Sequence, residues 1–239
     1  MKIKFAYLIP NFFTALSVFF GVMSVIASSQ GKYEKAFIYI VFSLIADGLD
    51  GRVARLTNTT SKFGVEFDSL ADIVAFGVAP AMLLFFAIGE HYGRFGALVS
   101  GLYVVFGAIR LARFNVTTNE NDPRYFIGLP IPTAAVVLGS WVMLDVKYKS
   151  GIDVFILIGA LFLGLLMVSN FRYPSFKKID LNKNIALKVL IVIIIIASFI
   201  YLYPVESLAS ILTIYAFYGM FRGIKGYMKA VRKVKSERR

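Results

Sequence analysis

The chain has 239 residues, of which 58% are hydrophobic, and its mean hydropathy is +0.73. This composition excludes a soluble globular domain and predicts a polytopic membrane protein. The formal net charge is +12, but the basic residues lie in short loops and at the C-terminus, where membrane topology places them. We therefore expect no nucleic-acid partner, and the lack of cysteine excludes a disulfide framework.

The apolar segments predict an all-α fold, with residues 1–239 forming one membrane domain of eight helices that each span about 30 Å of hydrocarbon. In chain order, the predicted helices cover residues 5–28, 33–56, 65–88, 95–114, 130–144, 152–171, 185–203 and 205–221. The seventh contains the run LIVIIIIASFI, whose side chains we expect to face lipid. Residues 222–239 form a basic tail, and Gly223 and Gly226 are expected to loosen its beginning.

The distribution of basic residues predicts the orientation of these helices. If the N-terminus is cytoplasmic, the external segments carry 5 of the 26 Lys and Arg residues, and 21 remain on the inner side. The positive-inside rule then places both termini in the cytoplasm, and we expect the chain in the inner membrane of the cell. In this topology the end of the second helix and the start of the third lie at one depth, just beneath the cytoplasmic interface.

Residues 47–72 carry four carboxylates in otherwise apolar surroundings. Asp47 and Asp50 are three residues apart and Asp68 and Asp72 are four apart, so each pair shares a helix face. If the two helices face each other, the four carboxylates repel one another unless a cation lies between them. Oxygen ligands without Cys or His suit Mg²⁺ or Mn²⁺. The alternative is a structural role, in which the acids pair with the neighbouring arginines at 52 and 55.

The spacing D-x-x-D-G-x-x-A-R…G-x-x-x-D-x-x-x-D resembles the signature of the CDP-alcohol phosphatidyltransferases, and every defining position is filled. The resemblance implies transfer from a CDP-lipid to an alcohol, with a divalent metal, Mg²⁺ or Mn²⁺, as the cofactor. It implies that Asp72 is the catalytic base. The implied metal ligands are Asp47, Asp50, Asp68 and Asp72. The implied CDP-lipid-binding residues are Asn11, Thr14, Gly51, Ala54, Arg55 and Gly64.

The residue types of this donor site suit a nucleotide lipid. The small residues of the signature leave room for a ligand to approach the backbone. Arg55 offers a positive charge to a phosphate bound beside a metal. Asn11 and Thr14 are three residues apart in the first helix, so both polar groups can point into one site.

Four further elements resemble the CDP-diacylglycerol–serine O-phosphatidyltransferase branch of this family: F-G-V-A-P-A at 76–81, R-L-A-R-F-N at 110–115, G-L-P at 128–130 and R-Y-P-S-F at 172–176. This branch implies L-serine as the acceptor. A guanidinium fork holds a carboxylate bidentately, and the candidate serine-binding residues are Arg110, Arg113, Asn115, Thr133 and Arg172. Snorkelling of the two helix arginines to lipid phosphates is the structural alternative.

The family resemblance also implies a homodimer surrounded by membrane lipids, and it leaves open whether the lipid tails are diacyl esters or isoprenoid ethers. Three other functions compete with serine transfer. The acceptor could be glycerol 3-phosphate or inositol phosphate, which would also use the arginines. A cation-coupled secondary transporter needs a site near the midplane, whereas the polar residues here lie on one side. A purely structural membrane protein would not need four grouped acids.

Overall fold

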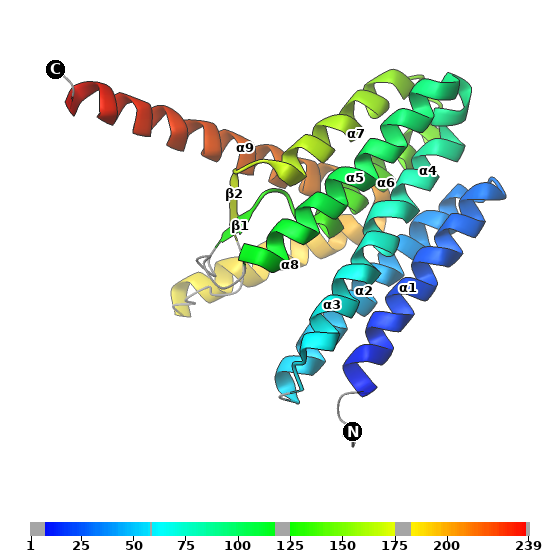
Figure 1. The fold of residues 1–239 in the computed structure, drawn as a ribbon, viewed down its shortest axis with the longest axis horizontal. Helices are drawn as coiled ribbons and strands as arrows, with labels where there is room; N and C mark the ends of the chain where they lie inside the picture. The colour runs from blue at the N-terminus through cyan, green and yellow to red at the C-terminus, as the bar shows by residue number, and fades with distance from the viewer. Residues whose placement is uncertain (1–7, 58, 118–124, 175–182, 238–239) are drawn as a thin grey trace.

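The computed structural model describes residues 8–57, 59–117, 125–174 and 183–237, and these form a bundle of helices (Figure 1). The helices are α1 (Leu8–Ser29), α2 (Tyr33–Leu56), α3 (Lys62–Asp72), α4 (Ala79–Ala87), α5 (Gly93–Thr117), α6 (Ile131–Tyr148), α7 (Asp153–Val168), α8 (Lys183–Leu202) and α9 (Pro204–Glu237). A π-helical segment, Ile73–Val78, joins α3 to α4, and a 3₁₀ turn, Gly89–Tyr92, precedes α5. The predicted all-α membrane bundle is confirmed.

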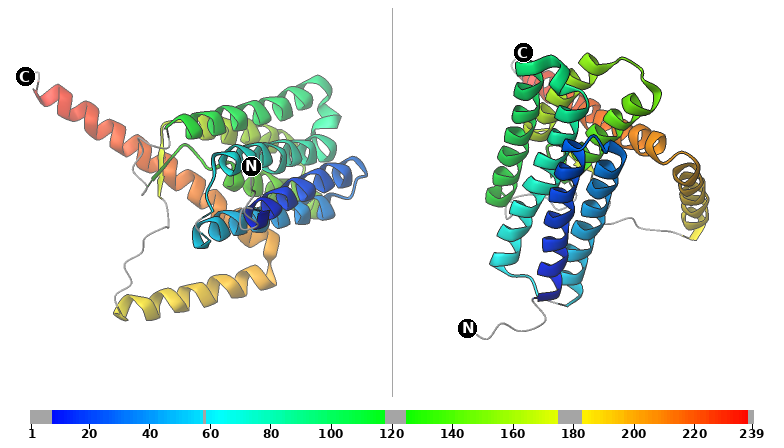
Figure 2. Two further views of the ribbon diagram at one scale, coloured as in Figure 1. Left: turned by 60° about the horizontal axis from the view of Figure 1, so that its bottom comes forward. Right: turned by 90° about the vertical axis from the view of Figure 1, so that its right-hand side faces the viewer.

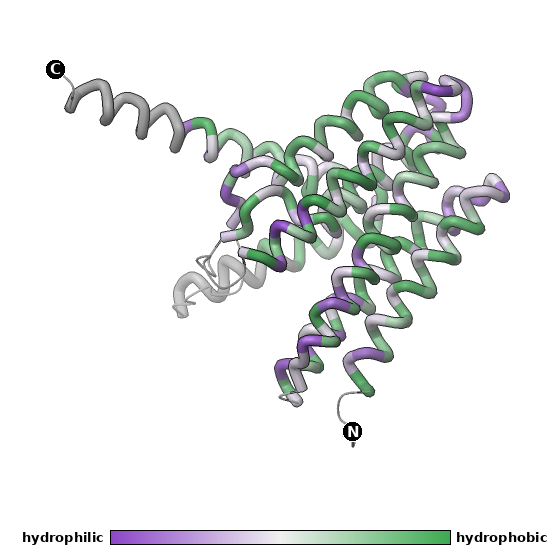
Figure 3. The backbone as a smooth tube through the Cα atoms, in the orientation of Figure 1, coloured by the Kyte–Doolittle hydropathy of each residue, from purple (hydrophilic) through white to green (hydrophobic). Residues whose placement is uncertain are grey.

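Four helical stretches within the described residues are long and apolar enough to cross a membrane: Leu8–Ser29, Lys62–Ala87, Gly89–Thr117 and Pro204–Lys225. Hydrophobic residues run along these helices, and hydrophilic residues gather at the ends of the bundle and around the α2–α3 turn (Figure 3). The class of membrane protein is therefore confirmed, and the number of eight spans stays a prediction. α2 begins and ends where the sequence predicted, but its last turns carry the charged residues of the signature.

α6 lies at the centre of the bundle and packs against α2, α4, α7 and α9. Its sequence is apolar with small residues interspersed, so side chains of neighbouring helices fit closely against it. A Cβ atom added at Gly139 would lie 2.7 Å from the ring of Phe37 on α2. This central position means that the start of α6 can fix several elements at once.

α8 stands apart from the rest of the bundle and packs mainly on α9 (Figure 2). The described side chains of the predicted lipid-facing run are exposed, including Ile194, Ile195 and Phe199. An apolar helix without polar partners suits a lipid environment. The described part of this run is therefore exposed, and its contact with lipid stays a prediction.

The basic C-terminal segment differs from the expectation, because α9 continues as one helix of 34 residues to Glu237. The prediction that Gly223 and Gly226 loosen it is wrong. A Cβ atom at Gly223 would lie 2.3 Å from the Phe171 ring, and one at Gly219 would lie 2.1 Å from the Tyr173 ring. Gly223 therefore allows close packing of α9 rather than a break, and the last turns run clear of the bundle (Figure 1).

Two short strands were not predicted. β1 (Tyr125–Ile127) and β2 (Arg172–Pro174) pair antiparallel, with Phe126 opposite Tyr173. Tyr173 is fully buried and its hydroxyl donates to the Ala216 carbonyl oxygen of α9 at 3.1 Å. With three residues each, these strands have no detectable alternation in the sequence. The sheet brings the segments that precede α6 and follow α7 together beside α9.

Candidate active site

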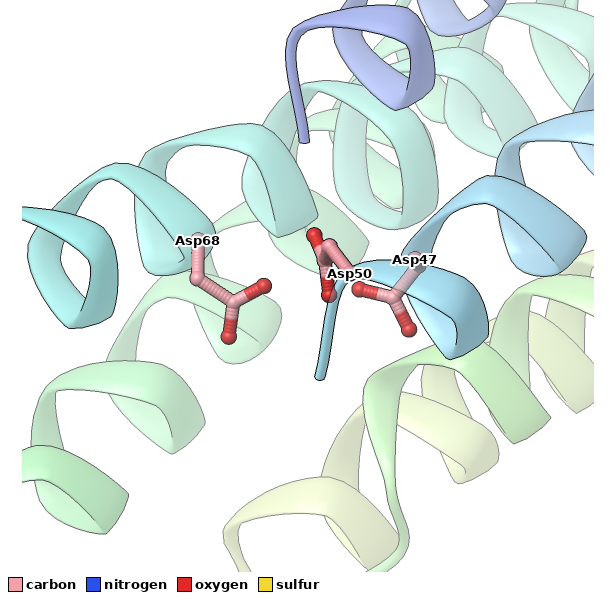
Figure 4. A group of neighbouring side chains, drawn as sticks. All are labelled: Asp47, Asp50 and Asp68. Carbon is pink, nitrogen blue, oxygen red and sulfur yellow. The ribbon is translucent and has the colours of Figure 1, made fainter. Parts of the chain in front are cut away.

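Three carboxylates of α2 and α3 lie together, as Figure 4 shows. One oxygen atom from each of Asp47, Asp50 and Asp68 lies within 4.8 Å of the other two. Asp50 is buried, and the other two are partly buried. Three carboxylates this close repel one another unless a cation or protons compensate their charge. Oxygen-only donors fit a hard divalent cation such as Mg²⁺ or Mn²⁺.

Asp72 lies behind this group, in the last turn of α3, and is buried. Its side chain contacts that of Asp47, and one of its oxygens, Oδ1, is buried without a hydrogen-bond partner among the described residues. The π-helical segment begins at the next residue. Such segments are frequent at functional sites because they leave main-chain groups free and redirect side chains. The four acids of the signature therefore lie together. Asp47, Asp50 and Asp68 form one group, and Asp72 contacts Asp47.

The structural alternative for these acids predicts ion pairs with the neighbouring arginines. Within the described ranges, no nitrogen of Arg52 or Arg55 lies within 4.0 Å of an Asp oxygen of the cluster. Both arginines are exposed. The cluster thus forms no ion pair with these side chains, although the charge of Arg55 acts on Asp50 from a longer distance. Three grouped carboxylates without an ion pair support a cation as the missing partner.

A pocket of about 170 Å³ opens beside the cluster, between α1, α2 and α3. All six residues expected to bind the CDP-lipid line this pocket: Asn11, Thr14, Gly51, Ala54, Arg55 and Gly64. Asp50 and Asp68 form part of its wall. The hydroxyl of Thr14 donates to Asp50 Oδ2 at 2.7 Å, which orients that carboxylate. The acidic cluster and the pocket therefore form one continuous site.

The α2–α3 turn supplies residues to this pocket that sequence reasoning missed, namely Thr59, Thr60 and Ser61. Ser61 is the N-cap of α3, where its side-chain oxygen accepts a hydrogen bond from the Gly64 amide at 3.0 Å. A Cβ atom at Gly64 would lie 3.2 Å from this oxygen and 3.5 Å from Asn11 Oδ1. The run of hydroxyl residues before a helix was the available signal, because Ser and Thr favour N-caps.

Arg110 and Arg113 lie one turn apart on α5, but the structure separates their environments. Arg110 is buried, with the charges of Asp72 and Asp47 close by, and its guanidinium lies 5.1 Å from the Phe114 ring centre. Its Nε has no hydrogen-bond partner among the described residues. The positive charge of Arg110 therefore lies close to Asp72 and Asp47 of the acidic cluster.

Arg113 points to the end of α7 instead. Its terminal nitrogens donate to the main-chain oxygens of Ile127 (3.3 Å), Met167 (3.1 Å), Val168 (2.7 Å) and Ser169 (2.9 Å). Nη1 also donates to Asn170 Oδ1 at 3.3 Å. Carbonyls at a helix C-terminus lack intrahelical partners and favour a cation. The fork of Arg113 is thus occupied by main chain.

The other three expected serine-binding residues occupy different places. Asn115 bridges to α3, where its Nδ2 donates to Ser69 Oγ at 2.9 Å. Thr133 is half-buried in the first turn of α6, and Arg172 is exposed in β2 opposite Ile127. Among the described residues, neither Thr133 nor Arg172 forms a hydrogen bond or ion pair with the acidic cluster. The structure brings Arg110 to the cluster and leaves these residues outside its hydrogen-bond network.

A helix bundle with grouped carboxylates beside a polar pocket at one end is the arrangement of a membrane phosphotransferase. The CDP-alcohol phosphatidyltransferase family model matches residues 7–166, and the chain belongs to this family. It is 52% identical to the CDP-diacylglycerol–serine O-phosphatidyltransferase of Helicobacter pylori strain J99, over 94% of each chain.

Archaeal relatives are also similar to this chain. The CDP-diacylglycerol–serine O-phosphatidyltransferase of Methanocaldococcus jannaschii is 34% identical over 91% of this chain and 95% of its own. The archaetidylserine synthase of Methanothermobacter thermautotrophicus is 36% identical over 72% of each. The predicted family and branch resemblance are therefore confirmed.

Proposed function

We propose that this enzyme transfers the phosphatidyl group of CDP-diacylglycerol, or of an ether-lipid equivalent, to the hydroxyl of L-serine. The products are phosphatidylserine, or its ether analogue, and CMP. The observation that carries the proposal is the match to relatives named for this reaction over 94% of the chain. The pocket beside the acidic cluster supports it, because it gathers every residue expected to bind the donor.

The donor side consists of the pocket residues and the metal ligands. Asp47, Asp50 and Asp68, with Asp72 behind them, would hold Mg²⁺ or Mn²⁺, which supplies positive charge to the diphosphate and so improves CMP as a leaving group. Arg55 lies at the pocket and can bind a phosphate oxygen. The glycines of α2 and α3 leave space for the nucleotide. Thr14 holds Asp50 in place through its hydroxyl.

On the acceptor side, the serine hydroxyl attacks the phosphorus that carries the lipid. A bond forms between the serine oxygen and phosphorus, the bond from phosphorus to the CMP oxygen breaks, and the hydroxyl proton passes to Asp72 as general base. The unpartnered Oδ1 of Asp72 is available for that proton. Arg110 is our candidate for holding the serine carboxylate, because it lies next to Asp72 with an unpartnered Nε.

The test is an acceptor screen with purified protein, CDP-diacylglycerol and Mg²⁺ or Mn²⁺. L-Serine, glycerol 3-phosphate and inositol phosphate are offered separately, and the lipid product is identified by mass while CMP release is measured. We expect serine-dependent CMP release and a product with the mass of phosphatidylserine. Product formation with a phosphorylated acceptor in place of serine would contradict the proposal and assign Arg110 to an acceptor phosphate.

We also propose that both termini are cytoplasmic in the inner membrane, as the distribution of basic residues predicts. Single cysteines at Ser150 and Ser236 in this cysteine-free chain should then react with an impermeant reagent from opposite sides of sealed vesicles. Labelling of both positions from one side would contradict this topology. The homodimer that the resemblance implies stays a prediction, and the mass of the purified protein in detergent checks it.

A further inference from the structure

Two glycines on different helices form a socket beside the candidate site. Gly77 lies in the π-helical segment after Asp72, and Gly107 lies on α5, and both are buried. The side chains of Ile73 and Ile131 fill the space between them. A Cβ atom at Gly107 would lie 2.7 Å from Ile131 Cδ1, and one at Gly77 would lie 2.7 Å from Ile73 Cδ1. Neither glycine could become alanine without moving an isoleucine.

The start of α6 fixes Ile131 firmly in this socket. The side chain is fully buried, and the preceding turn is attached to α7 and to Phe171, the residue before β2. The amide of Gly128 donates to the Phe171 oxygen at 2.8 Å, and that of Leu129 donates to the Leu166 oxygen at 3.0 Å. Gly128 has a φ of +76°, and a Cβ there would lie 2.1 Å from the Met167 oxygen.

Arg113 completes this anchor. It joins the oxygen of Ile127, at the end of β1, to the carbonyls that end α7. The turn at 128–130 is therefore held between two secondary-structure elements immediately before Ile131. β-Branching restricts χ1 of Ile131. The complete burial of the side chain in a close-packed interior restricts its Cδ1 end as well, so Ile131 acts as a rigid wedge.

Short stretches of backbone connect the socket to Asp72 and Arg110, two of the buried charged residues of the candidate site. Ile73 directly follows Asp72, and Gly107 precedes Arg110 by one helical turn. The π-helical segment is also held from its other sides. The Tyr103 hydroxyl of α5 donates to the Phe76 oxygen at 3.4 Å, and a Cβ at Gly21 of α1 would lie 2.9 Å from Ala75 Cα. A displacement of the Ile131 side chain would press on Ile73 and Gly107, and it would therefore move Asp72 and Arg110 relative to each other.

We propose that Ile131 is a positioning residue, which sets the separation of Asp72 and Arg110 by filling the socket between Gly77 and Gly107. The inference rests on the proposed function, in which Asp72 accepts the serine proton and Arg110 holds the serine carboxylate. The donor pocket, formed by α1, α2 and α3, does not share this socket. Displacement of the wedge therefore alters the attack on phosphorus through Asp72 and Arg110, and it leaves the pocket residues and the carboxylates of Asp47, Asp50 and Asp68 in place.

The decisive variant is Gly107→Ala, with Gly101→Ala as the matched control. Both glycines lie on α5, so both variants gain the same helix propensity. They differ in space, because a Cβ at Gly101 has no neighbour within 4 Å. Since a displacement of about 1 Å can cost a hundredfold in rate, we expect Gly107→Ala to lower kcat between about ten- and a hundredfold. The KM for the CDP-lipid should stay unchanged, and Gly101→Ala should behave as wild type.

The rescue variant is Gly107→Ala with Ile131→Val, which removes the Cδ1 atom that the new methyl group would strike. We expect most of the lost kcat to return. Wild-type kcat in Gly107→Ala would overturn the inference. So would a double variant that regains the wild-type melting temperature without regaining kcat, because that result assigns the socket to stability alone. A wild-type enzyme without serine-dependent CMP release would instead reject the proposed function.

Discussion

The donor side and the acceptor side of the proposed site are assembled in different ways. The donor side comes from α1, α2 and α3, with most of its residues inside the stretch 47–72. The acceptor side comes from the π-helical segment, α5 and the start of α6, which β1, β2 and the end of α7 hold in place. One side depends on three helices that follow one another in the chain, and the other depends on segments distributed over about a hundred residues.

This difference explains why two arginines on one helix have different environments. Arg110 faces the acids that α3 contributes, whereas Arg113 caps the carbonyls at the end of α7. Helical spacing places both on similar faces, but the distant segment that each one meets decides its role. The described parts of the four branch elements lie close to Arg113 and Ile131, through Gly77, the turn at 128–130 and the pairing of β2 with β1, and we infer that they build the acceptor side. Ser175 and Phe176 of the fourth element lie outside the described residues.

The largest expected effect concerns the donor side. Replacement of a residue that only orients a metal ligand lowers metal affinity or activity about ten- to a hundredfold. Asp68→Asn and Asp50→Asn change a proposed ligand itself, so each should lower turnover by more than about a hundredfold. Glu66→Gln is the matched control, because Glu66 lies on α3 beside Asp68 but is exposed and outside the cluster. CMP release measured against Mg²⁺ concentration checks this. A folded Asp68→Asn enzyme with normal turnover at low metal would remove that residue from the site.

The next effect separates the two arginines. Arg110→Lys loses the guanidinium fork and should raise the KM for serine about ten- to a hundredfold, since a hydrogen bond to a charged group contributes about 1.5–3 kcal/mol. Arg113→Lys leaves carbonyls at the end of α7 without donors, so it should lower the free energy of unfolding by about 1–3 kcal/mol. Its serine KM should change little. Kinetics and thermal unfolding of both variants make the comparison.

If Arg113→Lys raises the serine KM as strongly as Arg110→Lys does, the two residues share one role and the distinction drawn here is wrong. If Arg110→Lys weakens only the CDP-lipid, then this arginine serves the donor phosphates. The acceptor site would then lie elsewhere in the molecule.

A smaller effect is expected from filling the donor pocket. A Cβ at Gly51 would lie 3.8 Å from Arg55 Nη1, so Gly51→Ala causes no clash within the protein, but its methyl group enters the pocket. We expect the KM for the CDP-lipid to rise about tenfold, as expected for one methyl group in a fitted site. Gly48→Ala, on the same helix with no neighbour within 4 Å, is the control and should not change it. Equal effects of the two variants would place the nucleotide outside this pocket.

The smallest effect should come from Thr14. Thr14→Val removes the hydroxyl that donates to Asp50 at 2.7 Å, whereas Thr14→Ser keeps it. A lost hydrogen bond of about 1 kcal/mol corresponds to about fivefold. We therefore expect the Mg²⁺ concentration for half-maximal activity to rise about fivefold in Thr14→Val and to stay near wild type in Thr14→Ser. A metal titration of CMP release gives this value directly.

The sequence alone determined the membrane fold and the bounds of α2, and it predicted six of the residues that line the donor pocket but not Thr59, Thr60 and Ser61. The physical reason is that these features are local. Hydropathy depends on a single segment, and spacings of three and four residues fix which side chains share a helix face. Two such faces on consecutive helices, joined by a short turn, have to meet, so Asp50 and Asp68 could be paired from the sequence.

Only the tertiary structure decided how the acceptor side is built. Arg113 lies one turn from Arg110 on the same helix, and its role follows from where α7 ends. Gly107 is constrained by Ile131, and Gly223 by Phe171, each across a large separation in the chain. The strands β1 and β2 form because they meet each other and α9. Contacts between distant segments leave no periodic signal in either segment, so their partners become visible only when the chain is folded.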